Sequence, residues 1–321
     1  MVDQPLTLGG RSIQGRLWLA PMAGVTDLPF RVVAAELGCP FSVTEMVSAK
    51  GIYYGGKTLD LLQTHPAQGP GLVQLFGRDP RLMAHMAKRL FDQGLCRDGV
   101  DINMGCPAPK IVKNGEGSAL LLEPRLCGEI VSAVKKAIPL PVTVKIRRGF
   151  GAGEDVIEEL CPILEEAGAD AVAIHGRTRD QMYAGQADWD CIRRAKALLR
   201  IPVIGNGDVA SRGDAEERMA ETGCDGVLVG RGAFGNPFLF SKRIFSPEER
   251  LAVIERHLDL TLALRGERVG VPLMRKHLCA YIKGFRGGAK ARPQILSANT
   301  REEILAPVRR VMLAPFDKEE R

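Results

Sequence analysis

The sequence predicts an α/β fold: a closed parallel TIM (β/α)8 barrel followed by a small all-helical C-terminal domain. Short apolar runs rich in β-branched residues recur eight times, and loops and helix-like stretches separate them. These runs are continuous rather than alternating, which is typical of strands covered on both faces. After residue 242 the runs stop and apolar residues recur every three or four positions. We therefore expect a barrel with an N-terminal hairpin over residues 1–242 and a helical domain over residues 243–321.

The expected strands follow one another at intervals that leave room for a helix between most of them. In chain order they are Leu17–Ala20, Phe41–Thr44, Leu72–Phe76, Val100–Asn103, Val142–Ile146, Ala171–His175, Val203–Gly205 and Gly226–Val229. Ahead of them, Leu6–Ile13 has two central glycines and is typical of a hairpin that covers the barrel floor. A doubly wound open sheet is the alternative, and it is less favoured because no Gly-x-Gly-x-x-Gly turn follows the first strand.

Composition excludes several classes of protein. Hydrophobic residues make up 45% and charged residues 26% of the 321 residues, as in a globular protein and unlike a disordered or collagen-like chain. No apolar run approaches the roughly 20 residues of a membrane-spanning helix. None of the eight cysteines forms a Cys-x-x-Cys pair, so we expect no metal site. Single cysteines in apolar segments and the lack of a secretory signal predict a cytoplasmic protein.

The C-terminal region differs from the barrel in charge. Residues 241–321 carry 17 basic and 10 acidic side chains, whereas residues 1–240 carry 27 and 28. Residues 271–300 hold six basic residues and no acidic one, with Tyr281 and Phe285 among them. Basic side chains bind phosphates and aromatic rings stack on bases, so the pattern indicates a nucleic-acid partner. A solvated helix face is the alternative. Helices are expected from Pro247, near Leu273–Lys283 and at Arg301–Leu313.

Polar residues and glycines follow the expected strands, at the end of the barrel where catalytic groups lie. They are Pro21, Met22, Ala23, Gly24, Glu45, Gln74, Asn103, Cys106, Lys145, His175, Arg177, Asn206, Gly207, Asp208, Gly230 and Arg231. The last five follow strands seven and eight, the usual phosphate position of such barrels. Glycine amides can approach a phosphate there, and Arg231 supplies a charged fork. Ordinary tight turns are the alternative for each group taken alone.

Two of these residues suggest specific chemistry. Lys145 can neutralise a developing anion such as a reduced flavin ring, form a Schiff base, or make a structural ion pair. Gly105 and Pro107 fix a bend that projects Cys106. Its thiol is mostly protonated at neutral pH and can act as a general acid, whereas a nucleophilic role needs a nearby base.

Several motifs carry a resemblance to a known family. They are Ala-Pro-Met-Ala-Gly-Val-Thr-Asp (20–27), Thr-Glu-Met (44–46), Asp-Ile-Asn-Met-Gly-Cys-Pro (101–107), Gly-Ser-Ala-Leu-Leu (117–121), Val-Lys-Ile-Arg (144–147), Ile-His-Gly-Arg-Thr (174–178), Gly-Asn-Gly-Asp (205–208) and Val-Gly-Arg-Gly (229–232). Over roughly residues 8–240 the chain resembles the tRNA-dihydrouridine synthases, and the likeness continues at Met274–His277.

The resemblance implies an FMN-binding barrel and a helical tRNA-binding domain. Such enzymes reduce the C5–C6 double bond of uridines in tRNA and use NADPH to recharge the flavin. Cys106 would be the catalytic acid that protonates C5. The implied cofactor residues are Pro21, Met22 and Ala23 along the ring, Gln74 and Lys145 at its pyrimidine edge, His175, and Asn206, Gly207, Asp208, Gly230 and Arg231 around the phosphate. The predicted substrate contacts are Asn103, Arg177, Arg275, Lys276, Lys283 and Arg286.

Other functions remain open from the sequence. A small-molecule FMN oxidoreductase of the dihydroorotate or enoate type would share the flavin site but leaves the basic helical region unexplained. An aldolase acting through Lys145 and a non-catalytic RNA-binding protein are further alternatives, and flavin colour with NADPH oxidation separates both from the leading interpretation. The target uridine, ribosomal RNA as a second target and the preference for NADPH over NADH are not encoded in any visible motif. We expect a monomer, because nothing in the sequence demands a dimer.

Overall fold

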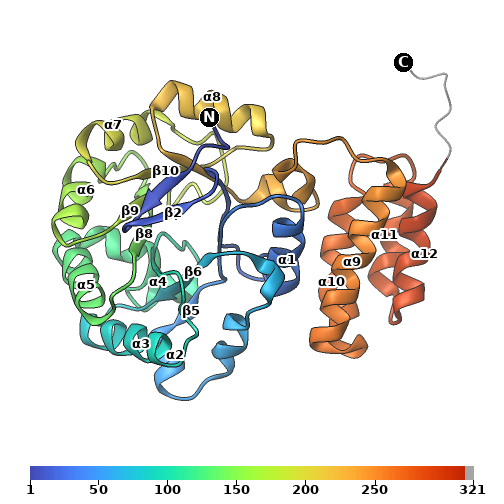
Figure 1. The fold of residues 1–321 in the computed structure, drawn as a ribbon, viewed down its shortest axis with the longest axis horizontal. Helices are drawn as coiled ribbons and strands as arrows, with labels where there is room; N and C mark the ends of the chain where they lie inside the picture. The colour runs from blue at the N-terminus through green and yellow to red at the C-terminus, as the bar shows by residue number, and fades with distance from the viewer. Residues whose placement is uncertain (315–321) are drawn as a thin grey trace.

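Eight parallel strand positions close into a barrel in the computed structural model, which describes residues 1–314 (Figure 1). The strands are β3 (Leu17–Leu19), β4 (Ser42–Val43), β5 (Val47–Ser48), β6 (Gly71–Phe76), β7 (Val100–Met104), β8 (Val142–Gly149), β9 (Ala171–Thr178), β10 (Val203–Asn206) and β11 (Gly226–Val229). The short strands β4 and β5 share the second position, and β4 pairs with both β3 and β6 to close the ring. The expected barrel is confirmed, and the open sheet is excluded.

Helices surround the barrel as an outer layer, visible as the arc from α3 to α8 in Figure 1. They are α1 (Leu28–Glu36), α3 (Pro80–Asp92), α5 (Pro124–Ala137), α6 (Ile157–Glu166), α7 (Asp190–Leu198) and α8 (Arg212–Thr222). Two shorter helices, α2 (Ala49–Tyr53) and α4 (Pro109–Lys113), lie in the loops that follow β5 and β7. Side-chain caps begin several of these helices, such as Asp79, whose carboxylate accepts the backbone N–H of Leu82 before α3.

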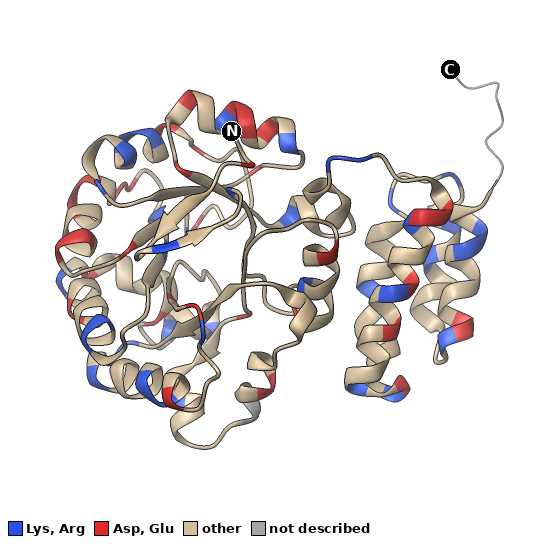
Figure 2. Cartoon of the chain, viewed as in Figure 1, with Lys and Arg blue, Asp and Glu red and all other residues tan. Residues whose placement is uncertain are grey.

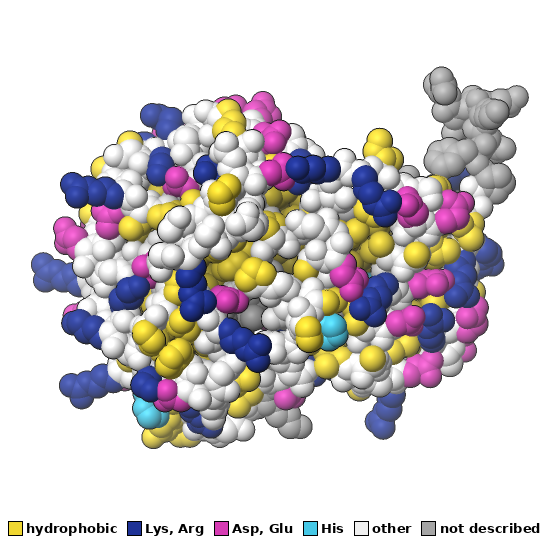
Figure 3. All heavy atoms as spheres, in the orientation of Figure 1, with side chains coloured by type: hydrophobic (Ala, Val, Ile, Leu, Met, Phe, Trp, Pro, Cys, Tyr) yellow, Lys and Arg dark blue, Asp and Glu magenta, His cyan; other side chains and the backbone are white. Residues whose placement is uncertain are grey.

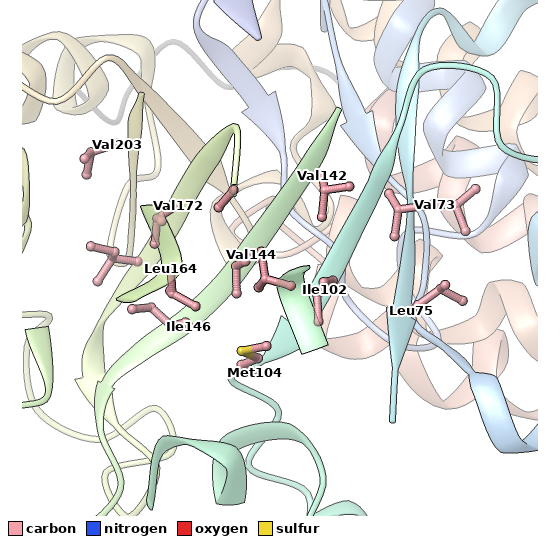
Figure 4. Packing of buried hydrophobic residues seen from close by; sticks show 14 of the residues in the cluster. Val73, Leu75, Ile102, Met104, Val142, Val144, Ile146, Leu164, Val172 and Val203 are labelled. Carbon is pink, nitrogen blue, oxygen red and sulfur yellow. The ribbon is translucent and has the colours of Figure 1, made fainter. Parts of the chain in front are cut away.

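Alternation along the strands separates two faces that are both buried. On β8, Val142, Val144 and Ile146 point outward and pack with helical residues such as Leu164 (Figure 4). Thr143 and Lys145 lie between them in the chain and face the barrel interior, where they contact other strands. An apolar outer face and a polar inner face thus occur on one strand, which positions the functional groups inside the mouth.

The N-terminal hairpin lies across the barrel in the foreground of Figure 1. Strands β1 (Leu6–Leu8) and β2 (Arg11–Ile13) pair antiparallel. Leu6, Leu8 and Ile13 join a buried cluster with inward-facing barrel residues, including Trp18 and Phe41. The hairpin therefore covers the floor as expected, because its apolar side chains complete the lower interior layer.

Within the described residues four helices follow the barrel: α9 (Pro247–Arg265), α10 (Glu267–Tyr281), α11 (Gly288–Ser297) and α12 (Arg301–Met312). Their shared core includes Val33 and Leu37 from α1 and Phe238 from the end of the barrel, so the helical region packs directly on the barrel. Among residues 1–314 no helix is both long and apolar enough to span a membrane. Residues 315–321 of the expected helical domain lie outside the described residues.

The helices of this region differ from the expected ones in two places. Helix α10 begins at Glu267 rather than near Leu273, and continues through Pro272. Helix α11 was not expected at all, because Gly287, Gly288 and Pro293 are typical helix breakers. Burial of Ala291 and Ile295 in the shared core stabilises α11 despite these residues.

Candidate functional site

A layer of polar side chains lies inside the mouth of the barrel, directly above the apolar floor. It contains Gln74, Asp101, Asn103, Thr143, Lys145, His175 and Asn206, which come from five neighbouring strands, β6 to β10. All except Lys145 are buried, so their hydrogen bonds must be made within the layer or to a bound ligand.

Asp101 and two carboxamides form one connected chain of hydrogen bonds. The Asp101 carboxylate accepts from Thr143 Oγ1 and from Gln74 Nε2, each at 2.6 Å. Gln74 Oε1 accepts from Asn103 Nδ2 at 3.0 Å. Asn103 Oδ1 then accepts the backbone N–H groups of Gly105 at 3.2 Å and Cys106 at 2.9 Å. The strand residues are thus connected to the backbone of the loop that carries the thiol.

Cys106 is half-buried at the start of that loop. Burial raises the pKa of its thiol, opposed by a backbone hydrogen bond from Ala108 and by the charges of Arg147 and Lys145. Arg147 supports the loop from the next strand, because its Nε donates to Gly105 O at 3.1 Å. The raised pKa keeps the thiol protonated through neutral pH, so Cys106 can donate a proton.

Lys145 is the partly exposed cation of the layer. Its Nζ donates to Asn206 Oδ1 at 3.0 Å, and Asn206 Nδ2 donates to Leu228 O at 2.7 Å, which fixes the sense of the amide. Burial lowers the pKa of Lys145 to about 8, assisted by the charge of Arg147 and opposed by Asp101. A charged amine that has lost part of its hydration favours an anionic ligand, because the anion stabilises the positive charge in place of water.

His175 is neutral because it lies among cations. Burial lowers the pKa of its imidazole, and the charges of Lys145, Arg147 and Arg177 lower it further. Arg177 Nη1 lies 3.4 Å from His175 Nε2. Since a guanidinium only donates, Nε2 is the acceptor and Nδ1 carries the proton. His175 therefore carries one N–H donor, at Nδ1.

Asp208 organises the groups after β10 and β11. Its Oδ2 accepts from Arg177 Nη2 at 2.6 Å and from Ala187 N at 2.7 Å, and its Oδ1 accepts from Arg231 Nη2 at 3.0 Å. These donors lower the pKa of Asp208 against the raising effect of burial. The Arg231 guanidinium also lies 4.7 Å from the centre of the Tyr183 ring. The Arg231 side chain is half exposed, so an anion can reach it.

Gly207 is required at the turn before Asp208. Its φ is +130°, and an added Cβ would lie 2.5 Å from Ala187 Cβ and 3.1 Å from His175 Cδ2. Only glycine combines that backbone conformation with the close approach. The turn is therefore shaped for close packing against Ala187 and His175.

The loop after β3 carries Pro21, Met22 and Ala23 at the mouth, half-buried or exposed. The backbone of Gly24 is held from two sides, because its N–H donates to the Glu45 carboxylate and its carbonyl accepts from Lys276 Nζ of α10. Gly230, after β11, lies beside Met22, since a Cβ there would lie 3.4 Å from Met22 Sδ. Met22 of this loop thus stands next to the turn that follows β11.

The expected substrate residues occupy different environments. Arg177 is 1% exposed and donates to Ala184 O and Gly185 O as well as to Asp208, so its guanidinium is used within the chain. Arg275 donates to Ala298 O at 2.7 Å. Lys276 contacts the barrel loop, whereas Lys283 and Arg286 are exposed beyond α10. Figures 2 and 3 show basic and acidic residues interspersed over the helices of both parts.

Among the site residues without a sequence-based prediction of a role are Asp101, Arg147 and Tyr183. The first two had a usable signal, because Asp101 stands two residues before Asn103, and Arg147 two residues after Lys145. A separation of two places residues on the same face of a strand. Tyr183 lies in the loop after β9 and had no such signal. No group of His, Cys, Asp or Glu in residues 1–314 is arranged to hold a metal ion.

Comparisons with known proteins agree on fold and family. The family model "Dihydrouridine synthase (Dus)" matches residues 18–314. A "Probable tRNA-dihydrouridine synthase 1" of Synechocystis sp. is 39% identical over 312 residues, covering 94% of this chain and 87% of that protein. A "tRNA-dihydrouridine synthase B" of Xanthomonas campestris is 37% identical over 316 residues, covering 95% of each.

Solved structures with the same barrel are much more distant in sequence. A 2-naphthoyl-CoA reductase complex has a TM-score of 0.59 at 13% identity, over 74% of this chain and 51% of that one. Morphinone reductase in complex with tetrahydroNAD has a TM-score of 0.51 at 14% identity, over 74% of this chain and 88% of that one. At this identity the likeness supports the fold alone.

Proposed function

This chain belongs to the dihydrouridine synthase family, and we propose that it is an FMN-dependent oxidoreductase that reduces the C5–C6 double bond of uridines in tRNA. The observation that carries this proposal is the half-buried Cys106 thiol, in a loop that hydrogen bonds tie to the barrel mouth where Lys145 lies. A small-molecule flavin reductase is less favoured, because the matched relatives named for tRNA align over nearly the whole chain, helical region included.

The donor set of the mouth fits FMN. Arg231 and the backbone around Gly207 and Gly230 would hold the phosphate. The Asp208 carboxylate accepts only, so its part would be to hold Arg231 rather than to touch the phosphate. Lys145 would bond the pyrimidine edge of the ring, with Gln74 beside it.

The remaining cofactor contacts follow the same geometry. Pro21, Met22 and Ala23 would lie along the ring, His175 would donate from Nδ1, and Asn206 would orient Lys145. These roles complete the set that the family motifs imply. They account for the mixture of apolar and cationic groups at one mouth.

Reduction of the C5–C6 double bond requires a proton donor on one face of the uracil ring. When bound, FMN supplies the hydride that adds to C6, the electrophilic carbon conjugated to the C4 carbonyl. The charge that develops on the uracil is discharged when the Cys106 thiol gives its proton to C5. Asn103 would position the base, because it borders both Gln74 and the Cys106 loop.

The helical region would bind the tRNA. A uridine must leave its stack to enter a barrel mouth, which costs a few kcal/mol that backbone contacts must offset. The exposed Lys283 and Arg286 would contact phosphates, whereas Lys276 and Arg275 would act next to the junction with the barrel. For Arg177, the buried contacts favour an indirect role in which it holds the loop that borders the mouth.

The proposal extends to the reductant and the state of the protein: NADPH as the electron source, and a cytoplasmic monomer. Oxidation of NADPH and NADH by the purified protein, followed at 340 nm, compares the two nicotinamides. Sedimentation of the flavin-loaded protein checks the monomer.

Replacing Cys106 with Ala tests the assigned chemistry. Dihydrouridine formation in tRNA under multiple turnover should fall by about 100-fold to 10,000-fold, the usual contribution of a general acid. Flavin content and NADPH oxidation should not change. Cys279→Ala is the matched control, because Cys279 is a partly buried thiol on α10. Full activity of Cys106→Ala would remove the role given to the thiol.

A further inference from the structure

We propose that Asp101 is a positioning residue for the proton donor, and that it acts by fixing the sense of two carboxamides that hold the Cys106 loop. The inference builds on the proposed function, in which Cys106 is the acid. Asp101 itself is 3% exposed and lies below the mouth, so it acts through Gln74 and Asn103 rather than on a ligand.

The two ends of the hydrogen-bond chain have fixed polarity. The backbone N–H of Cys106 can only donate. Burial raises the pKa of Asp101, and the hydrogen bonds from Gln74 and Thr143 and the charge of Lys145 oppose this shift; the ionised carboxylate that they favour can only accept. Between them lie Gln74 and Asn103, whose amides each carry an acceptor and a donor of similar size. A chain through two such groups satisfies both ends in one sense only: Cys106 N–H to Asn103 Oδ1, Asn103 Nδ2 to Gln74 Oε1, and Gln74 Nε2 to Asp101 Oδ2.

Reversal of either amide would set two donors or two acceptors against each other. With Asn103 turned over, its NH2 group would face the N–H groups of Gly105 and Cys106. Because the chain is buried, water cannot compensate for such a clash. The carboxylate at one end and the N–H groups at the other therefore both favour the arrangement that holds the thiol loop against the end of β7.

Thr143 completes the arrangement at the other oxygen. Its hydroxyl donates to Asp101 Oδ1 at 2.6 Å, which leaves the second oxygen for Gln74. Asp101 lies on the inner face of β7, two residues before Asn103. Strand β7 thus supplies both Asp101, which helps to fix the sense of the amide chain, and Asn103, the last amide of that chain.

Asp101→Asn tests the inference with little change in size. The new amide can donate as well as accept, so the reversed chain loses one of its two unfavourable contacts, the one at residue 101, and keeps the one at the Cys106 N–H. We expect hydrogen exchange at the Cys106 amide, followed at residue resolution in the full-length FMN-loaded protein, to become about fivefold faster, the factor of one net hydrogen bond. Dihydrouridine formation from prereduced enzyme should slow, while flavin reduction by NADPH and tRNA affinity stay within about twofold of the wild type.

Asp170→Asn is the matched control. Asp170 is a half-buried carboxylate at the other end of the barrel, where it accepts from Lys135 Nζ and Val142 N. This variant should leave exchange at Cys106 unchanged even if it lowers the free energy of unfolding. Equal acceleration in the two variants, or none in Asp101→Asn, would overturn the inference.

Gln74→Met covers the case in which Asp101→Asn does not fold. It interrupts the amide chain at its middle without changing the carboxylate. Faster exchange at Cys106 supports the inference, and unchanged exchange overturns it, whatever happens to flavin binding. Hydrogen exchange at Cys106 does not depend on reduction of RNA. A wild-type protein that makes no dihydrouridine would therefore refute the proposed function, whereas the exchange rates would still test the role of Asp101.

Discussion

Lys145 makes the affinity for FMN depend on pH in a direction that follows from its surroundings. Its pKa falls from 10.5 to about 8 in the folded protein, first because of burial. Below about pH 8 the amine is charged, and above it the charge is lost. If the cation is needed to hold the flavin, the dissociation constant for FMN rises about tenfold for each pH unit above 8. The dissociation constant at pH 9 should therefore be about tenfold larger than at pH 7.

Quenching of FMN fluorescence during titration of the flavin-free protein measures this dependence between pH 7 and pH 9. Lys145→Gln should bind FMN more weakly at pH 7 and show no such rise at pH 9. Lys135→Gln, on the outer helix α5, should retain the wild-type dependence. A wild-type affinity that stays constant over this range, or a Lys145→Gln protein with the same tenfold rise, would refute the reasoning.

Three further predictions concern the loops, the RNA and the fold. Arg177→Met removes the donors that Asp208 and the loop after β9 rely on; it should lower the free energy of unfolding by about 2–4 kcal/mol in urea titrations and weaken FMN binding. Lys283→Met should reduce the salt dependence of tRNA binding by about one unit of slope, with flavin reduction by NADPH unchanged. Gly205→Ala would place a Cβ 2.7 Å from Trp189 Cη2, so it should lower the melting temperature, at a cost of about 1–3 kcal/mol.

Local pattern was sufficient to predict the barrel. The outer faces of the strands carry apolar residues such as Val142, Val144 and Ile146. A β-rich segment followed by a loop and a helix recurs along the chain. Helix α11 was missed because local propensity argues against a helix that contains Pro293. Its stability comes from burial of Ile295 against helices distant in the sequence, and propensity alone does not report that burial.

The site was predictable to the extent that position along a strand reveals it. Cys106, Lys145 and Asn206 were found because polar residues at strand ends are conspicuous between apolar runs. Arg177 was expected at the substrate, and only the structure shows that it is buried against the loop after β9. The sequence shows Asp101 only as a polar residue within a strand. Its hydrogen bonds to residues on β6 and β8 are known only from the structure.

The sequence by itself determined the architecture and the residues at the mouth, because alternation and strand-end chemistry are local properties of the chain. The tertiary structure alone decided how those residues act on one another. A hydrogen-bond chain from Asp101 to Cys106, the depressed pKa of Lys145 and the neutral state of His175 depend on distances between strands and on burial. Such distances exist only once the barrel has closed and water has been excluded.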